Sequence, residues 1–350
     1  MRNILLIYRG QVFDTEIKPR LDQYKNDNVV LVIDNKLTRK IIGYITKDYE
    51  QKINIVTIHE YLNQGVVDNM KFDVTSVNPP YQLQVGEGSR GKTEAIWHKV
   101  LDKCLKQSNK GGELVMINPG AWRNVSGIFK PLQEKILSLR LHKLEMNSVK
   151  KGKEVFGVNT DYDVLYLTNE PRTENFKTKI TDYLGNEYEY DLSDVEFIPN
   201  ANLDKVYSLV AKPTEEKTEV LYSRSMYGTD KKNMSPEKVS EFKYPCAYTV
   251  GSVNPNFWYS NTDKSGHFGV PKVIWGNGLT DVIVDKDGQY GLTQFTYAIV
   301  DDVENLEMIQ KALKSEDFIK NIMGYQKGVG HIYNRKVIET FRKDFWKEFV

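Results

Sequence analysis

The residues best suited to chemistry in this sequence form one short stretch, Asn78-Pro79-Pro80-Tyr81. The Asn78 side-chain oxygen can accept a hydrogen bond from an –NH2 group, and Pro79, which lacks an N–H, still offers its carbonyl as a second acceptor for the same amine. Prolines lock φ and hold such acceptors in place, so that the nitrogen lone pair is left to attack a methyl donor. Tyr81 adds a flat ring on which a base can stack, a contact worth ~1–3 kcal/mol. This chemistry needs placement and electrostatics rather than a nucleophile.

The position of this stretch in the chain supports a functional reading. A proline-rich turn after a strand also occurs as a purely structural feature. Here the stretch follows the apolar run Phe72–Val77, which has Asp73 at its second position. In an open α/β sheet the reactive groups gather at the carboxyl ends of the strands. The four residues therefore stand where a site is expected.

The elements that must position this stretch are visible as short apolar runs rich in β-branched residues. Such runs predict strands buried on both faces. They cover residues 3–8, 29–34, 53–58, 72–77, 113–118 and 161–167. Between the fourth and fifth runs, an apolar stripe at helical spacing predicts a helix, and Gly111-Gly112 is expected to separate that helix from the next strand. The stripe consists of Trp97, Val100, Leu101, Cys104 and Leu105. The pattern predicts an α/β fold with a doubly wound, mostly parallel, Rossmann-like sheet.

The second half of the chain has a different character, and 350 residues suit two domains. Charged turns, short Tyr-rich strands and long loops dominate from Glu170 to Asp287. Two amphipathic helices are predicted near the end, one with Leu306, Ile309 and Leu313, the other with Val337, Ile338, Phe341 and Phe345. We expect a first domain over residues 1–175 and a β-rich or mixed second domain over residues 176–350.

Composition excludes several classes of protein. The net charge of +1 means that any nucleic-acid contact must come from local clusters of Lys and Arg. Two unpaired cysteines and five scattered histidines predict a reducing compartment, no disulfide scaffold and no metal site. No run approaches the ~20 apolar residues of a membrane span, so we expect a cytoplasmic protein with no membrane partner. The oligomeric state is not readable from the sequence.

The stretch Lys71–Gln82 (KFDVTSVNPPYQ) resembles motif IV of the amino-methyltransferases, in particular the adenine-N6 DNA methyltransferases of type II restriction–modification systems. The likeness extends over roughly residues 29–170. It includes the acidic-aromatic step His59–Leu62, the helix start at Trp97–Lys99, the strand and its ending in Gly111–Trp122, and the late stretch Val155–Leu167. The NPPY block is specific to amino-group methylation, whereas the other stretches are weak alone.

The resemblance implies S-adenosylmethionine as methyl donor and double-stranded DNA as partner. It implies that Asn78 and Pro79 bind the target amine, that Pro80 shapes the turn, and that Tyr81 stacks on a flipped base, since the amine is inaccessible to such a pocket inside a duplex. Phe156 would be a second stacking face, or simply a core aromatic. The second half becomes a target-recognition domain, with Tyr248–Gly278 rich in aromatic and polar residues. Lys264 and Lys272 are candidate phosphate contacts there, or solvated lysines.

The expected cofactor contacts lie at the ends of the first three strands. Asp34 follows the second run and suits the ribose hydroxyls, and Glu60 after the third could reach the adenine end. Asn78, beside the methyl donor, is expected to touch the cofactor as well. The turn after the first run offers only Tyr8-Arg9-Gly10-Gln11, with one glycine instead of a Gly-rich loop. Tyr8 and Gly10 are the candidates in a divergent pocket.

This departure keeps two other functions open. One is methylation of a different amino group, on an RNA base or a protein glutamine, because NPPY-like motifs serve both. The other is a degenerate methyltransferase that binds DNA or a partner without turnover. The choice requires binding and transfer measurements rather than further sequence inspection.

A second motif, which resembles a phosphate-binding loop, follows shortly after the first. Residues Gly86–Thr93 (GEGSRGKT) satisfy the spacing of a phosphate-binding loop, and Thr93 could cap a following helix. The strand that should run directly into such a loop is missing, because NPPYQLQV intervenes. We therefore favour a Gly-rich lid over the site, with Arg90 and Lys92 facing backbone phosphates.

Overall fold

The computed structural model describes residues 1–8, 13–47, 49, 52–84, 93–125, 127–222, 226–250, 256–264, 266–276, 281–323 and 335–350. The chain divides into two compact units, Met1–Ile198 and Pro199–Val350. Each is considered separately below.

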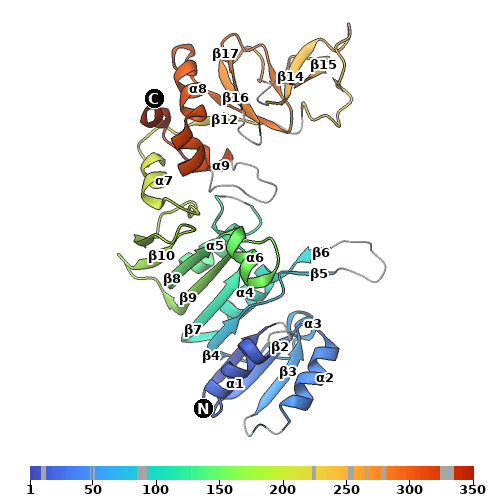
Figure 1. Ribbon diagram of the computed structural model, residues 1–350, viewed down its shortest axis with the longest axis vertical. Coiled ribbons are helices and arrows are strands. Elements are labelled where there is room, and N and C mark those ends of the chain that lie inside the picture. Colours follow the sequence, from blue (N-terminus) through green and yellow to red (C-terminus); the bar gives the residue numbers. More distant parts are fainter. Residues whose placement is uncertain are drawn as a thin grey trace. The chain divides into compact units, whose positions relative to one another are not determined.

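The first unit is built on a nine-stranded sheet with the order β11-β10-β8-β9-β7-β4-β1-β2-β3 (Figure 1). Its strands are β1 (Asn3–Ile7), β2 (Asn28–Ile33), β3 (Ile53–Thr57), β4 (Phe72–Val77), β7 (Ser108–Asn118), β8 (Leu139–Asn147), β9 (Tyr162–Pro171), β10 (Lys177–Thr181) and β11 (Glu187–Asp191). Strands β3, β2, β1, β4 and β7 run parallel, and β9 is antiparallel to both of its neighbours. The predicted α/β fold with a mostly parallel, doubly wound sheet is confirmed, and all six predicted runs are strands.

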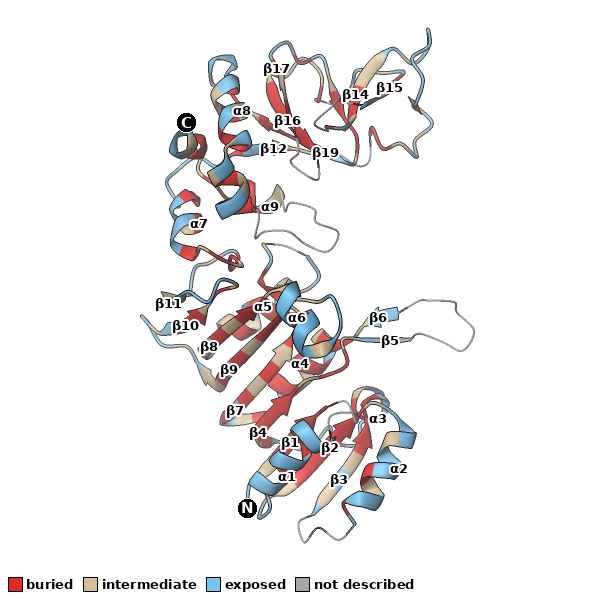
Figure 2. Ribbon diagram, in the orientation of Figure 1, coloured by how far each residue is buried: buried red, intermediate tan, exposed pale blue. Residues whose placement is uncertain are grey.

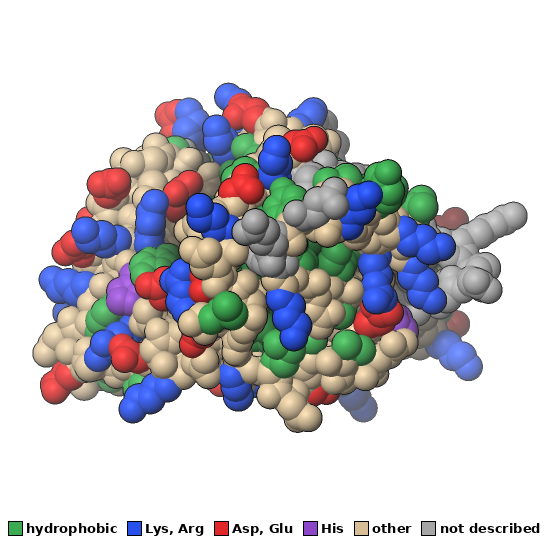
Figure 3. Space-filling model, turned by 90° about the horizontal axis from the view of Figure 1, so that it is seen from below, with side chains coloured by type: hydrophobic (Ala, Val, Ile, Leu, Met, Phe, Trp, Pro, Cys, Tyr) green, Lys and Arg blue, Asp and Glu red, His purple; other side chains and the backbone are tan. Residues whose placement is uncertain are grey.

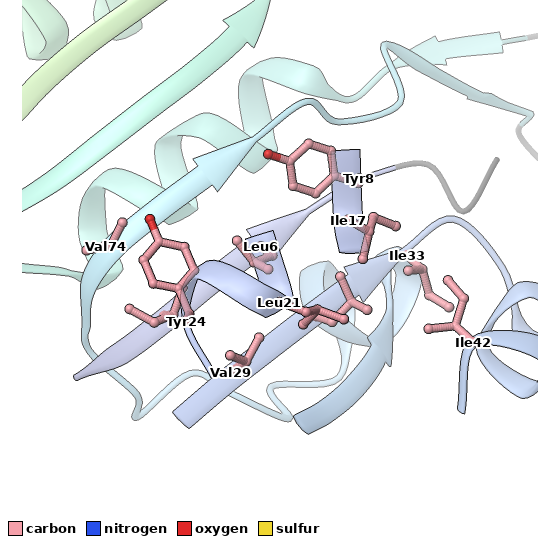
Figure 4. Close-up of a cluster of buried hydrophobic side chains, with 11 residues drawn as sticks. Leu6, Tyr8, Ile17, Leu21, Tyr24, Val29, Ile33, Ile42 and Val74 are labelled. Atoms are coloured by element: carbon pink, nitrogen blue, oxygen red, sulfur yellow. The ribbon is translucent and has the colours of Figure 1, made fainter. Parts of the chain in front are cut away.

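Helices cover both faces of the parallel part of the sheet. Figure 1 shows α1 (Lys18–Gln23) in front of the sheet and α4 (Trp97–Gln107) behind it. The helices α2 (Lys36–Ile45), α3 (Ile58–Asn63), α5 (Lys130–Leu137) and α6 (Val149–Phe156) complete the unit. Side chains of β1, β2, α1 and α2 form one buried cluster, which includes Leu6, Leu21 and Ile42 (Figure 4). In Figure 2 the strands are accordingly buried and the outer helix surfaces exposed.

The predicted helix between the fourth and fifth apolar runs is α4, and all five residues of its stripe are buried. The expected break at Gly111-Gly112 is wrong, because β7 already begins at Ser108. Gly111 has φ +75°, and a Cβ on Gly112 would lie 2.6 Å from the Ser108 hydroxyl and 3.0 Å from the Phe72 carbonyl. The register of β7 against β4 shifts here. The glycine pair thus permits a close backbone approach within a strand.

The first unit ends later than the expected boundary after residue 175. Strand β10 pairs in parallel with β8, and β11 pairs with β10, so both extend the sheet. The Ile198 amide then donates to the Arg123 carbonyl at 3.0 Å. These backbone bonds explain why residues 176–198 belong to the first unit.

The second unit contains two four-stranded sheets. One has the order β12 (Glu219–Leu221), β19 (Thr296–Val300), β16 (Lys272–Gly276) and β17 (Val282–Asp285). The other has the order β13 (Met234–Ser235), β15 (Asn256–Ser260), β14 (Tyr244–Thr249) and β18 (Gly291–Leu292). Side chains from both sheets share a core that includes Ala247, Ile274 and Ala298. The helices are α7 (Leu203–Leu209), α8 (Leu306–Lys314) and α9 (Arg335–Ile338).

One of the two helices predicted near the end of the chain is confirmed and the other is not. Leu306, Ile309 and Leu313 are buried on α8 as expected. The second helix stops at Ile338, because Phe341 pairs with Val210 in an antiparallel bridge. Its four apolar residues are nevertheless all buried. Burial was therefore predicted correctly where helical structure was not.

Two findings concern the expectations drawn from composition. Cys104 and Cys246 are both buried and free. Among the described residues, no helix has the length and apolar character needed to cross a bilayer.

Candidate active site

The NPPY stretch lies at the carboxyl end of β4, between the ends of β1 and β7. The Asn78 amide donates to the Ile7 carbonyl at 2.8 Å, and the Ile96 amide donates to the Tyr81 carbonyl at 3.1 Å. Both prolines are buried, while Asn78 and Tyr81 are half-buried. A short ribbon of β5 (Gln82–Gln84) and β6 (Thr93–Ala95) follows (Figure 1). The backbone of the stretch is thus held at both ends.

A cavity of about 320 Å³ adjoins this end of the sheet. Val77, the residue before Asn78, lines it, as does Tyr8, the residue after β1. The other lining residues are Thr15, Glu16, Pro19, Arg20, Gln23, Ser76, Val115 and Ile117. Its volume falls at the lower end of the range for small-molecule sites. Open space for a ligand therefore lies beside Val77, the residue that precedes Asn78 in the chain.

Tyr8 is buried and connects β1 to β4. Its hydroxyl lies 2.5 Å from the Ser76 hydroxyl, and its amide donates to the Val32 carbonyl at 3.1 Å. Burial raises the pKa of Tyr8, so the phenol stays protonated near neutral pH. Gly10, the other candidate in this turn, lies outside the described residues.

The two acidic candidates occupy different situations. Asp34 directly follows β2 and is half-buried, and its carboxylate accepts a hydrogen bond from the Asn35 side chain at 3.0 Å. Glu60 belongs to a capping box at the start of α3, where its carboxylate accepts from the Thr57 amide at 2.8 Å and pairs with Arg39 at 2.9 Å. The hydrogen bond from the Thr57 amide lowers the pKa of Glu60. Contact with a cofactor would compete with these bonds at Glu60.

Beside β4, strand β7 also ends in an Asn-Pro pair, Asn118-Pro119, which is followed by a short 3-10 helix, η3 (Gly120–Arg123). A buried network fastens this helix to β9. The Asp163 carboxylate accepts from the Trp122 indole at 2.7 Å and from the Arg123 guanidinium at 2.8 Å. Burial raises the pKa of Asp163, an effect that the charge of Arg123 opposes.

Sequence reasoning identified Trp122 through its motif but missed Arg123 and Asp163. An acidic residue inside the apolar stretch DYDVLYL was the available signal. Asp163 stands opposite Asn118 in the β7–β9 pairing. Because β9 is antiparallel, its first residues lie at the same edge of the sheet as the end of β7. The network therefore fixes the strand next to the NPPY stretch.

Phe156 is the last residue of α6 and is half-buried. Its ring lies 4.8 Å from that of Tyr162 in an edge-to-face contact. Tyr162 begins β9, so Phe156 is brought to the carboxyl edge of the central strands. Both of its sequence readings, a stacking face and a packed aromatic, are compatible with this placement.

Of the two lysines suggested as phosphate contacts, only one is accessible. Lys264 is exposed. Lys272 is fully buried, and its ammonium pairs with Asp285 at 2.6 Å and donates to the His267 carbonyl at 2.8 Å. Lys272 therefore cannot serve as a phosphate contact. The prediction was wrong because Lys272 occupies an inward-facing position of strand β16, whereas the sequence suggested a surface lysine.

The competing phosphate-loop motif is not supported at its one described residue. Thr93 begins strand β6 and does not cap a helix; α4 starts only at Trp97. A phosphate-binding loop must lead directly into its helix. The lid residues Arg90 and Lys92 lie outside the described residues.

Charge is mixed rather than segregated on the face shown in Figure 3, where basic and acidic side chains alternate. In the described residues, no three His, Cys, Asp or Glu side chains come together to hold a metal ion. At the end of β4, the polar groups of the stretch are amide and carbonyl groups. The adjoining cavity adds the Tyr8 and Ser76 hydroxyls and the charged residues Glu16 and Arg20.

Comparison with known proteins gives one matching family model and one similar curated protein. Residues 5–156 match the model of the Eco57I restriction-modification methylase family. An uncharacterized adenine-specific methylase of Mycoplasma pneumoniae is 32% identical over 136 residues. This similarity covers 36% of the chain and 28% of that protein.

Solved structures give weaker similarities. The methyltransferase subunit of a type I restriction-modification system from Streptococcus thermophilus is 11% identical, with a TM-score of 0.40 over 52% of this chain and 42% of that one. A methyltransferase from Pyrococcus furiosus is 18% identical, with a TM-score of 0.30 over 48% of this chain and 75% of that one. The family match, over residues 5–156, confirms the resemblance to restriction–modification methylases that the NPPY stretch indicated.

Proposed function

We propose that this protein transfers a methyl group from S-adenosylmethionine to the N6 amine of adenine in double-stranded DNA. The observation that carries the proposal is the NPPY stretch, held at both ends at the carboxyl end of β4, with a cavity lined by the preceding residues Ser76 and Val77. The family match over residues 5–156 and the adenine-specific methylase relative support the same chemistry.

The residues of this stretch would act by orienting the amine. Asn78 and Pro79 offer two neutral oxygen acceptors, one for each N–H, and this arrangement leaves the nitrogen lone pair directed away from them. The cofactor supplies an electrophilic methyl group when bound. The amine held by Asn78 and Pro79 would accept that methyl group, with the cofactor's sulfur as leaving group, and would release one proton to water. Fixed acceptors of this kind stabilise the transition state without reorganising.

The residues near the site fit such a cofactor. The cavity offers hydroxyl groups, one cation and one anion, and Asp34 at the end of β2 is placed for ribose hydroxyls. Glu60 is the less favoured contact for adenine, because Thr57 and Arg39 already hold its carboxylate.

On the DNA side, we propose that the target adenine leaves the helix and stacks on Tyr81, with Phe156 as a second face. Extrusion of a base costs a few kcal/mol, which stacking of ~1–3 kcal/mol per ring can offset in part. The second unit would supply target recognition, with exposed Lys264 as one phosphate contact.

A methyl-transfer assay with tritiated S-adenosylmethionine tests this function. DNA, RNA and protein substrates are compared, and labelled DNA is digested to nucleosides. N6-methyladenine is expected as the labelled product. Label found only in RNA, or only in protein, would show that this molecule and not DNA is the substrate. Cofactor binding without label in any substrate would favour the reading of a protein that binds without turnover.

A further inference from the structure

Helix α2 has an apolar outer face in addition to the apolar face that it buries. On the inner side Ile42 belongs to the buried cluster, and a Cβ added to Gly43 would lie 3.9 Å from the Ile55 side chain of β3. Figure 2 shows the rest of the helix largely exposed. On the outer side the exposed fractions are 69% for Leu37, 53% for Ile41, 72% for Tyr44 and 45% for Ile45. We call these four residues the apolar stripe, because their spacing of i, i+4, i+7 and i+8 places them on one side of the helix.

The apolar stripe leaves a substantial surface in contact with water. A large apolar side chain has roughly 150–200 Å² of accessible surface, so the four exposed fractions amount to on the order of 400 Å². Single apolar residues are common on protein surfaces, but contiguous patches of this size are often functional. The area also approaches one side of a small, transient protein interface. We therefore expect a partner that covers the stripe.

Lysines border the stripe along one flank. Lys36 and Lys40 are exposed and one helical turn apart, and each directly precedes a residue of the stripe, which puts both on the same flank. Just after the helix, the Lys47 ammonium lies 4.8 Å from the centre of the Tyr44 ring. In the part of the chain that the structure describes, none of these three lysines forms an ion pair. The flank thus presents cations to a partner without competing counter-charges.

The geometry favours a helix as this partner. Helix α2 spans ten residues and is therefore about 15 Å long. Side chains spaced i, i+4 and i+7 form a ridge that packs into the groove between the side chains of a second helix, and amphipathic helices recognise partners through anchors at this spacing. The positions that flank the apolar seam of such a pair select the partner by charge. Lysines on the flank of α2 therefore favour Asp and Glu on the partner.

Two other occupants fit less well. A second copy of this chain would bring a second set of lysines to the same seam, where like charges oppose pairing. A membrane surface binds amphipathic helices through charge attraction and a large apolar face. The net charge of this chain is only +1, and the stripe has just four apolar side chains.

We propose that α2 is a docking site for an amphipathic helix of a partner protein, with an apolar seam that covers the stripe and Asp or Glu side chains opposite Lys36 and Lys40. The inference goes beyond the proposed function and does not depend on it. None of the described residues that line the cavity beside β4 belongs to α2, so a docked helix leaves that cavity open.

Fluorescence anisotropy of the full chain with two labelled peptides tests the surface. Both peptides are about 20 residues long, with leucine at the a and d positions of a heptad repeat. One has Glu at the flanking e and g positions and the other has Lys. The acidic peptide should bind with a Kd of about 10–100 µM, as for a small transient interface, and the basic peptide at least about tenfold more weakly.

Variants of the full chain locate the binding. Ile41→Glu places a charge in the middle of the stripe at an exposed position, and the affinity for the acidic peptide should fall by about tenfold or more. Leu184→Glu is the matched control, because it changes an apolar residue of similar exposure, 51%, in the turn between β10 and β11, and it should leave the affinity unchanged. The double variant Lys36→Glu/Lys40→Glu keeps the stripe and should reverse the preference between the peptides.

Equal affinity of wild type for the two peptides, binding of neither, or an unreversed preference in the double variant would overturn the proposal. Sedimentation velocity tests the second copy, since self-association that Ile41→Glu abolishes would assign the stripe to a dimer instead. Co-sedimentation with vesicles of phosphatidylcholine and phosphatidylserine tests a membrane surface in the same way. We expect neither self-association nor vesicle binding that depends on Ile41.

Discussion

The Tyr8 and Ser76 hydroxyls lie 2.5 Å apart and join the end of β1 to the end of β4. Ser76 precedes Asn78 by two residues, and the Asn78 amide is bonded to β1 as well, through Ile7. The strand that carries the acceptor groups is therefore tied twice to the strand that borders the cavity. Such ties keep the Asn78 and Pro79 oxygens and the cavity in one fixed relation.

Tyr8→Phe tests the first of these ties. The ring can keep its packing, but the buried Ser76 hydroxyl loses its partner, which costs about 1–2 kcal/mol. We expect the free energy of unfolding of the first unit to fall by that amount, measured by urea denaturation. Tyr24→Phe is the control, because Tyr24 packs in the same cluster and its hydroxyl has no hydrogen bond within the described residues. Equal stabilities of wild type and Tyr8→Phe would contradict the role of this bond.

The network around Asp163 makes a second prediction. Asp163→Asn removes the carboxylate that pairs with the fully buried Arg123, and breaking a buried pair in this way costs about 3–5 kcal/mol. The unfolding midpoint of the first unit should drop strongly in thermal or urea denaturation. Glu145→Gln breaks the exposed Lys143–Glu145 pair and serves as the control, with an expected change below ~1 kcal/mol. Similar losses in the two variants would show that burial of the pair does not matter.

The central strands were predictable because they are buried on both faces, and strands of this kind have continuous apolar runs such as Val29–Ile33. The pairing of β10 and β11 could not be predicted from the sequence, because their alternating charged residues resemble those of exposed loops. Their strand structure depends on hydrogen bonds to β8, which lies earlier in the sequence, and a local sequence pattern does not indicate such bonds.

In the site, the local motif was readable and the partners supplied by distant segments were not. Asn78 and Tyr81 can be recognised in the sequence by their residue types and their spacing. Arg20 and Glu16 cannot, because only the fold brings their helical segment against β4. Lys272 was misjudged for a related reason, since its burial depends on Asp285 across the sheet. Charged residues are commonly exposed, and the exceptions need a partner that the sequence does not reveal.

His267 predicts a pH dependence of the second unit. Its side chain is buried, and burial lowers its pKa to about 4 from the ordinary 6.5. The unfolded chain therefore binds a proton between pH 6.5 and 4 that the folded one does not. Stability should be fully present above pH 6.5 and fall by about 3 kcal/mol as the pH drops to 4.

Denaturation of wild type and His267→Gln across this pH range measures the effect. The variant cannot take up the proton, so its stability should change less over the same window. A parallel loss of stability in both proteins would assign the pH dependence to other groups.

Phe156 makes a prediction about substrate rather than stability. Phe156→Ala removes a ring that would stack on the extruded adenine, a contact worth ~1–3 kcal/mol. We expect kcat/KM for DNA to fall by about tenfold or more, while Phe156→Tyr retains most activity. Steady-state methylation kinetics measure both variants. Unchanged kinetics in Phe156→Ala would leave this residue as a packing partner of Tyr162 alone.

The most direct test of the central claim compares methyl transfer and cofactor affinity in Asn78→Ala, with the exposed Asn63→Ala as control. Loss of a fixed acceptor for the amine should reduce the transfer rate by about 10²–10³-fold, a larger effect than on the affinity for S-adenosylhomocysteine, which Asn78 is also expected to contact. Wild-type transfer by Asn78→Ala would contradict the claim that the end of β4 grips the target amine.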